Sequence, residues 1–220
     1  MTAEARERAG RLPRLHVIAG DGIVGAEDCR ERLRPVLEAG GGGLALHLRV
    51  RRTPAARLFE VAEWLAEASR AAGTLVVVND RVDVALAAGA GGVHLREDSL
   101  PAGAVRAIAG RKLRVGRSIH EAGQAAALGD AGLDYLFMGA VYATASHPER
   151  TPAGPGAVAA AAAQTVAPVV AIGGITPARV RELAALGVYG VAVLSGVWGG
   201  ERPDHAVARY LQVLGEEGLQ

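Results

Sequence analysis

Two short apolar runs near the end of the chain each lead into small residues. The run VVAI is followed by Gly173 and Gly174, and the run VAVL is followed by Ser195 and Gly196. Such runs are typical of buried strands, and glycine lets backbone amides approach a bound group closely. Amides presented in this way suit the negative charge of a phosphate. We therefore predict that these four residues bind the phosphate of a small-molecule ligand.

Polar side chains gather where four other apolar runs end. The clusters are His47 with Arg49 and Arg51; Asn79-Asp80-Arg81; His94 to Ser99; and Arg117, Ser118 and His120. Alternate residues of an extended chain share one side, which predicts that His47, Arg49 and Arg51 face the same way. Imidazole titrates near neutral pH, so His120 is a candidate acid or base.

The elements that must position these residues alternate along the chain. Strands are predicted at 15–19, 44–49, 74–79, 92–95, 113–116, 135–139, 169–172 and 190–194. Helices are predicted at about 26–38, 55–71, 82–88, 101–109, 119–129, 156–165, 177–186 and 203–216. Eight such units indicate a closed (β/α)8 barrel, a TIM barrel of the α/β class, whose functional loops follow the strands. An open doubly wound sheet is the alternative, but the glycines at 20 and 22 lack the full dinucleotide-binding spacing.

Local signals place several of the boundaries. Thr53-Pro54 and Thr176-Pro177 each predict a helix N-cap followed by proline. Ser118 to Glu121 has capping-box spacing and predicts that a helix opens at Ser118, with its positive end favouring neutral His120. Residues 143–155 form the longest connection and are predicted to act as a lid, with Thr144 and Ser146 contacting the ligand.

Composition limits the class of protein. The 220 residues predict one domain over 1–220, with 1–12 as an irregular N-terminal extension. A net charge of +1 gives no sign of nucleic-acid or membrane binding, and no signal peptide is apparent, so a cytoplasmic location is expected. Cys29 is the only cysteine, which excludes an intramolecular disulfide. Lys112 is the only lysine and precedes a strand, so Schiff-base chemistry inside the barrel is not expected.

The order and spacing of these motifs resemble the thiamine phosphate synthase/TenI superfamily. The resemblance covers about residues 15–200 and is specific only in combination. Its motifs are Leu48-Arg49 with Arg51, NDRVD at 79–83, GVHL at 92–95, GRSIH at 116–120, MGAVYAT at 138–144 and VAIGGI at 170–175. It implies thiamine biosynthesis by one of two activities. A synthase joins a pyrimidine pyrophosphate to a thiazole phosphate with Mg²⁺, and a TenI-type tautomerase aromatises a thiazole phosphate carboxylate.

The departures from the synthase pattern favour the tautomerase. Where synthases read Gln-x-Arg-x-Lys, this chain has His47, Arg49 and Arg51. Synthases also read His-Leu-Gly-Gln-x-Asp, in which the final aspartate is the second ligand of Mg²⁺. Aligning this pattern with His94-Leu95 puts Ser99 at the position of that aspartate. Asp80 stands at the position of the first Mg²⁺-binding aspartate of the synthases, and Asp98 precedes by one residue the position where the second is replaced by Ser99. Thr-x-Thr-Lys becomes Thr-Ala-Ser-His at 144–147, which removes a further cation for pyrophosphate. A serine hydroxyl is a poor ligand for Mg²⁺.

The preferred prediction is therefore a TenI-like tautomerase without a cofactor, with His120 as general base. Its substrate is a phosphorylated thiazole. The site residues are Arg49 and Arg51 for the carboxylate, Asn79, Asp80, Ser118, Thr144 and Ser146, and the phosphate-binding Gly173, Gly174, Ser195 and Gly196. Alternatively, Arg51 forms a structural ion pair with Asp80 and does not bind the substrate carboxylate. A Mg²⁺-dependent synthase using Asp80 and a non-catalytic regulatory binder stay open. Assembly into a homo-oligomer also stays open, because no apolar stripe identifies an interface.

Overall fold

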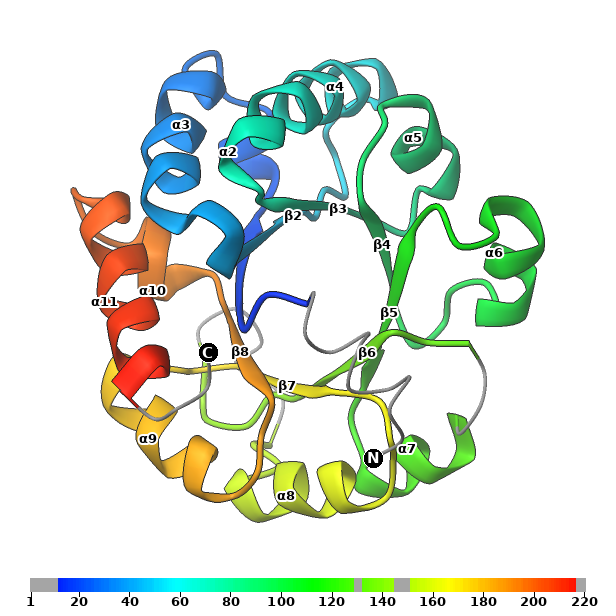
Figure 1. Ribbon diagram of the computed structural model, residues 1–220, viewed down its shortest axis with the longest axis vertical. Helices are drawn as coiled ribbons and strands as arrows, with labels where there is room; N and C mark the ends of the chain where they lie inside the picture. Colours follow the sequence, from blue (N-terminus) through cyan, green and yellow to red (C-terminus); the bar gives the residue numbers. More distant parts are fainter. Residues whose placement is uncertain (1–11, 129–131, 145–150, 217–220) are drawn as a thin grey trace.

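Eight parallel strands close into a barrel, which confirms the predicted (β/α)8 architecture. The computed structural model describes residues 12–128, 132–144 and 151–216. The strands pair in chain order, and β8 returns to pair with β1. In Figure 1, which looks along the barrel, the orange β8 lies beside the blue β1. The strands are β1 (Leu15–Ala19), β2 (Leu44–Leu48), β3 (Leu75–Asn79), β4 (Gly92–Leu95), β5 (Arg114–Ile119), β6 (Tyr135–Met138), β7 (Val169–Ile172) and β8 (Gly190–Val193).

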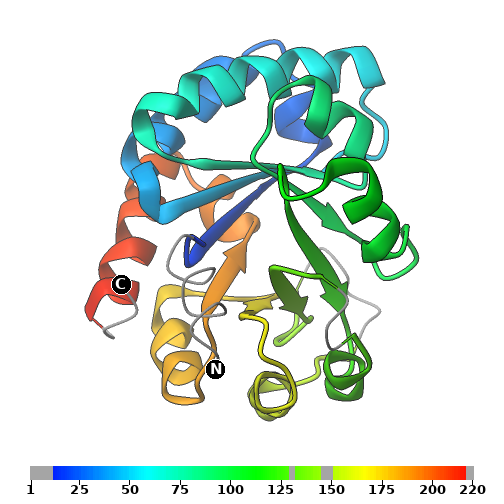
Figure 2. The ribbon, with the colours of Figure 1, turned by 45° about the vertical axis from the view of Figure 1, so that its right-hand side comes forward.

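Helices surround the barrel and cover the outer face of the strands (Figures 1 and 2). They are α2 (Asp21–Val24), α3 (Cys29–Gly40), the 3-10 turn η1 (Gly41–Gly43), α4 (Ala55–Ala72), α5 (Val82–Ala87), α6 (Ala102–Ala109), α7 (Ala122–Leu128), α8 (Pro155–Ala163), α9 (Pro177–Ala185), α10 (Ser195–Trp198) and α11 (Pro203–Glu216). Because the strands are buried on both faces, they appear in the sequence as continuous apolar runs rather than alternating ones. Among the described residues, no helix is long and apolar enough to cross a membrane.

The core has two parts. The larger lies between strands and helices, and the smaller lies inside the barrel around Tyr135 and Phe137. Leu12 is only 5% exposed and packs into the inner part, so the predicted N-terminal extension does not include it. Residues 1–11 lie outside the described part of the chain.

Three histidines fill the middle of the barrel. His16, His47 and His94 are each at most 1% exposed, and their rings pack against Phe137 with centroids 4.2–5.1 Å away. His16 Nδ1 and His47 Nε2 are 2.9 Å apart, so one of these nitrogens donates a hydrogen bond to the other. Burial lowers the pKa of His16 and of His94 to about 3, and it lowers that of His47 well below its usual value. All three imidazoles are therefore neutral in the folded protein at neutral pH.

Two predicted helix starts are wrong. Ser118 lies within β5, which continues to Ile119, and α7 begins only at Ala122. The hydroxyl of Thr53 does not cap α4, because it donates to Asp21 Oδ1 at 2.7 Å. Thr176 does precede α9, with Pro177 as the first helical residue, although its side chain makes no capping hydrogen bond.

Candidate active site

A pocket of about 420 Å³ opens where the strands end, at the rim expected for the functional face of such a barrel. Ten of the twelve predicted site residues line it. These are Arg49, Arg51, Asn79, Ser118, His120, Thr144, Gly173, Gly174, Ser195 and Gly196. Asp80 does not line the pocket, and Ser146 lies outside the described residues. The strand order therefore brings side chains from most of the chain to one cavity.

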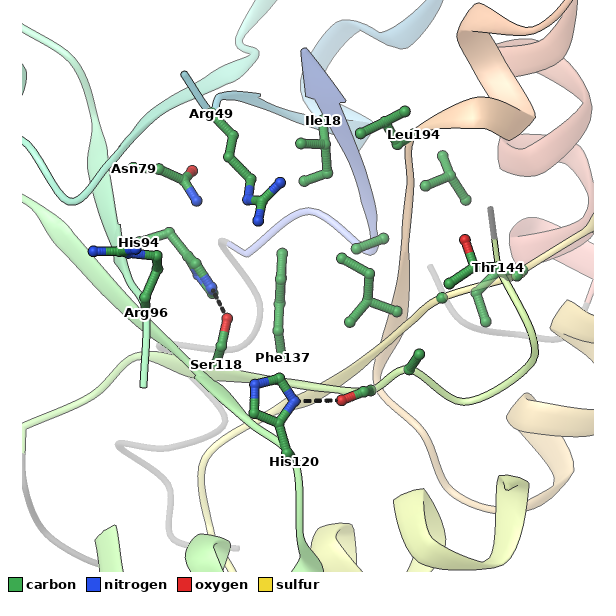
Figure 3. A pocket seen from close by; sticks show the side chains of 18 of the residues that line it. Ile18, Arg49, Asn79, His94, Arg96, Ser118, His120, Phe137, Thr144 and Leu194 are labelled. Carbon is green, nitrogen blue, oxygen red and sulfur yellow. Dashed lines mark hydrogen bonds between the residues drawn. The ribbon is translucent and has the colours of Figure 1, made fainter. Parts of the chain in front are cut away.

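His120 follows directly after β5 and presents one ring nitrogen to the pocket (Figure 3). Its Nδ1 lies 2.6 Å from the carbonyl oxygen of Gly139. A carbonyl oxygen only accepts hydrogen bonds, so Nδ1 carries a hydrogen, and in the neutral imidazole Nε2 is then the nitrogen with the lone pair. The side chain is 32% exposed, which leaves Nε2 accessible. This tautomer is the one that a base acting through Nε2 requires.

Gln124 of α7 fixes the backbone around His120. Its side-chain oxygen accepts hydrogen bonds from the backbone N–H of His120 at 2.6 Å and of Glu121 at 3.0 Å. Its amide nitrogen donates to the carboxylate of Glu97. The predicted capping box is thus replaced by a glutamine acting from inside the helix.

Glu97 lies in the loop after β4 and faces His120. Its Oε2 is 3.6 Å from His120 Nε2, and its side chain is 48% exposed. Arg117 of β5 ties down the same loop by donating to the carbonyl oxygens of Glu97 at 2.5 Å and of Leu100 at 2.9 Å. The sequence marked Glu97 only as a member of a polar cluster, whereas the structure places a carboxylate beside the candidate base.

Ser118 and His94 connect the pocket to the barrel interior. The Ser118 hydroxyl oxygen and His94 Nε2 are 2.9 Å apart, and Figure 3 shows this contact beside Phe137. His94 Nδ1 lies 3.2 Å from the Tyr135 hydroxyl. Nearby, Asn79 lines the pocket, but its side-chain oxygen is buried, and the electrostatics of His47 include a side-chain hydrogen bond with Asn79.

Two arginines after β2 supply positive charge. Arg49 extends into the pocket in Figure 3, and burial, aided by the charges of Arg51 and Arg96, lowers its pKa from the usual value. Asp21, at the start of α2, holds the loop that carries them. Its carboxylate accepts hydrogen bonds from the backbone N–H groups of Arg51, Arg52 and Thr53 at 3.0, 2.9 and 2.7 Å.

The pKa of Asp21 shows how strongly the loop holds this carboxylate. Burial alone would raise that pKa, but the hydrogen bonds from residues 51–53 outweigh burial and bring it well below its usual value. Asp21 is therefore ionised at neutral pH and acts as an anchor for the loop. Its role had no signal in the sequence, because its partners lie about 30 residues further along the chain.

The loops after β7 and β8 carry the predicted phosphate cradle. In the described part of the chain, the backbone N–H groups of Gly174, Ser195 and Gly196 donate to no carbonyl oxygen. Gly174 has φ 64°, and a Cβ there would lie 2.6 Å from the carbonyl oxygen of Ala143, so only glycine fits. Arg179 donates to the Gly174 carbonyl at 2.5 Å and holds this loop in place. Unpaired amides at a pocket wall are suited to an anion.

Asp80 has a different partner from the one expected. Its carboxylate pairs with Arg96, with Nε and Oδ2 2.6 Å apart, and not with Arg51. The reason is geometric: β3 and β4 are neighbours, and the Asp80 backbone N–H donates to the His94 carbonyl at the end of β4. The carboxylate is therefore turned toward the loop after β4. Arg96 and Asp98 line the pocket as well, although no role was predicted for Arg96.

Fold and site together define a (β/α)8 barrel with a pocket at the carboxyl ends of its strands, lined by arginine side chains and unpaired backbone amides. Residues 15–197 match the family described as "Thiamine monophosphate synthase" (TMP-TENI). The chain therefore belongs to this family, as the motifs of its sequence predicted.

Individual relatives agree with this assignment. The chain is 43% identical over 180 residues to the "Thiamine biosynthesis bifunctional protein ThiM/ThiE" of Symbiobacterium thermophilum, which covers 81% of this chain but only 37% of that longer protein. It is 37% identical to the "Thiamine-phosphate synthase" of Laribacter hongkongensis, covering 91% of this chain and 94% of the relative.

Among solved structures, the "Thiamine phosphate pyrophosphorylase" of Pyrococcus furiosus superposes with a TM-score of 0.81 at 30% identity, covering 96% and 98% of the two chains. The Laribacter protein is named for the synthase reaction, and the Symbiobacterium protein is named for thiamine biosynthesis. The comparisons thus support an enzyme of the superfamily and favour the synthase alternative over the TenI branch that the motif departures suggested.

Proposed function

We propose that the protein is a thiazole tautomerase that aromatises a thiazole phosphate carboxylate by proton transfer. The observation that carries this proposal is the tautomer of His120, in which Nδ1 is bonded to the Gly139 carbonyl and the basic Nε2 faces the pocket. Imidazole is a suitable base near neutral pH. The reaction is an isomerisation, so it needs no co-reactant.

The proton transfer proceeds in two steps. Nε2 of His120 takes the proton from C2 of the non-aromatic ring, and the C–H electron pair enters the ring. The double bond to the exocyclic carbon shifts into the ring, and that carbon takes up the proton from the imidazolium, which restores neutral His120. Glu97, 3.6 Å from Nε2, balances the positive charge that the imidazole carries between the steps.

The rest of the pocket matches the two anionic groups of this substrate. The free amides of Gly174, Ser195 and Gly196 suit its phosphate. Arg49 and Arg51, in the loop after β2, suit its carboxylate, because a guanidinium group binds a carboxylate through two parallel hydrogen bonds. The apolar floor formed by Ile18 and Phe137 suits the ring between them.

A thiamine-phosphate synthase is the second candidate, and the name of the Laribacter relative favours it. The family pattern implies Mg²⁺ for that reaction, so we tested whether the residues present fit the ion. Mg²⁺ is usually held by one or two carboxylates together with substrate phosphates. Asp80, the first aspartate of the pattern, is paired with Arg96, and Ser99 replaces the second. The residues present do not fit Mg²⁺.

Both reactions can be tested on one preparation. Purified protein is incubated with the non-aromatic thiazole phosphate carboxylate alone, or with thiazole phosphate and pyrimidine pyrophosphate, each with Mg²⁺ and with a chelator. We expect the aromatic thiazole in both conditions and no thiamine phosphate. Thiamine phosphate that forms only with Mg²⁺ would replace this proposal with the synthase. Binding of the thiazole compounds without any turnover would support the regulatory binder instead.

A further inference from the structure

Arg96 stands where the synthase pattern His-Leu-Gly-Gln-x-Asp has glycine, two residues after His94. A glycine there has no side chain and leaves the space beside Asp80 open. In this chain the space holds a guanidinium group, which lines the pocket and is 49% exposed (Figure 3). The exchange of a glycine for a fixed positive charge changes what this corner of the pocket can bind.

Arg96 uses both oxygens of the Asp80 carboxylate. Its Nε lies 2.6 Å from Oδ2, and its backbone N–H donates to Oδ1 at 3.0 Å. The same Nε is 3.6 Å from Oδ1 of Asp98, the residue nearest to the lost aspartate of the pattern. Both carboxylates that remain near the expected metal position therefore face one guanidinium group.

A divalent ion could bind here only by displacing this ion pair. A guanidinium group carries a fixed positive charge in proteins, so the one in this corner repels a cation. Two further arginines, Arg49 and Arg51, line the same side of the pocket. These three guanidinium groups match the three carboxylates of Asp80, Glu97 and Asp98, which leaves no excess of negative charge to attract Mg²⁺.

We infer that Arg96 takes the place of the divalent cation of the family. It pairs with Asp80, lies close to Asp98 and, together with Arg49, donates hydrogen bonds to the carboxylate of the substrate. The identity of that carboxylate rests on the proposed function, whereas the exclusion of a metal ion does not. Arg96 is on this inference a specificity residue that favours a carboxylated substrate over a metal-bound pyrophosphate.

Metal binding can be measured without turnover. Mn²⁺ serves as the probe for the Mg²⁺ position, and free Mn²⁺ is followed by electron paramagnetic resonance in wild type, Arg96→Gly, Ser99→Asp and the double variant. We expect weak Mn²⁺ binding by wild type and at least tenfold tighter binding by the double variant, which restores both positions of the pattern. Adding Asp80→Asn to the double variant should abolish the gain. Tight binding of one Mn²⁺ by wild type that Asp80→Asn removes would overturn the inference.

A second measurement tests the carboxylate. Binding of the aromatic thiazole phosphate carboxylate and of thiazole phosphate without the carboxylate is compared by calorimetry in wild type, Arg96→Gly and Arg96→Lys. We expect Arg96→Gly to weaken the carboxylated compound about tenfold and to leave the other unchanged, with Arg96→Lys in between. Equal weakening of both compounds, or of neither, would contradict the assignment. Circular dichroism establishes that each variant is folded.

The two proposals fail separately. Tight Mn²⁺ binding by a wild-type protein that still isomerises the thiazole would overturn the role of Arg96 and leave the proposed function standing. Absence of isomerisation, together with the expected gain of Mn²⁺ binding in the double variant, would overturn the proposed function and leave the exclusion of the metal intact.

Discussion

At the scale of single residues, the reactivity of the pocket depends on which nitrogen of His120 is protonated. Nothing in the side chain itself decides this. The Gly139 carbonyl, 2.6 Å from Nδ1, fixes the hydrogen on that nitrogen. Glu97 then faces the other nitrogen at 3.6 Å. The pair resembles an imidazole base with an adjacent carboxylate, assembled from two different strand ends.

Replacing His120 with glutamine should remove the base and keep a polar side chain of similar reach. We expect turnover of the thiazole substrate to fall by roughly 10²- to 10⁴-fold, the usual contribution of a general base, with little change in substrate binding. Steady-state kinetics measure both effects. His205→Gln is the matched control, because His205 is 67% exposed on α11 and should leave both unchanged. Full turnover by folded His120→Gln would rule out the assigned base.

At the scale of elements, the rim of the barrel depends on contacts between neighbouring loops. The short helix α2 follows β1, and through Asp21 it holds the loop between β2 and α4. That loop carries both Arg49 and Arg51. The position of the arginine side of the pocket is thus set by a carboxylate that does not itself line the pocket.

Replacing Asp21 with asparagine should loosen this loop. The variant keeps the shape but loses the charge and part of the acceptor capacity for three backbone N–H groups and the Thr53 hydroxyl. We expect the free energy of unfolding to fall by about 1–3 kcal/mol. KM should rise roughly tenfold, equivalent to about 1.4 kcal/mol of binding, with kcat changed less. Urea denaturation and kinetics test this, and exposed Asp28→Asn is the control. Unchanged KM in Asp21→Asn would show that the loop is held by other contacts.

At the scale of the whole molecule, the centre of the barrel is filled by neutral histidines. His16 and His94 have pKa values of about 3 in the folded protein because they are buried, compared with about 6.5 in an unfolded chain. Between these values the unfolded state binds more protons than the folded state. Stability is therefore fully present above about pH 6.5 and is lost as the pH falls toward 3.

Each buried histidine should steepen the acid loss of stability by about 1.4 kcal/mol per pH unit. Between pH 6.5 and pH 5, the free energy of unfolding should fall less steeply with pH in His16→Asn than in wild type. The expected difference between the two slopes is about 1.4 kcal/mol per pH unit. Urea denaturation at several pH values measures the slope. His205→Asn, which changes an exposed imidazole, should keep the wild-type slope. An unchanged slope in His16→Asn would mean that His16 is protonated in the folded protein.

The sequence by itself determined the barrel and the rim where its polar residues meet. Eight short apolar runs alternate with helical segments, and both patterns are local, since burial on two faces requires an unbroken apolar run. The predicted strands match the observed ones to within one residue except at β5, which continues to Ile119. There the local capping signal at Ser118 was overruled by pairing with β6.

Only the tertiary structure decided which polar groups meet at the rim. Asp80 pairs with Arg96 rather than Arg51, Glu97 approaches His120, and Asp21 anchors a loop 30 residues away. These contacts join different strand ends, and their partners depend on the register and stagger of the closed barrel. No local spacing encodes that register, so the sequence named most residues of the pocket but could not assign their partners.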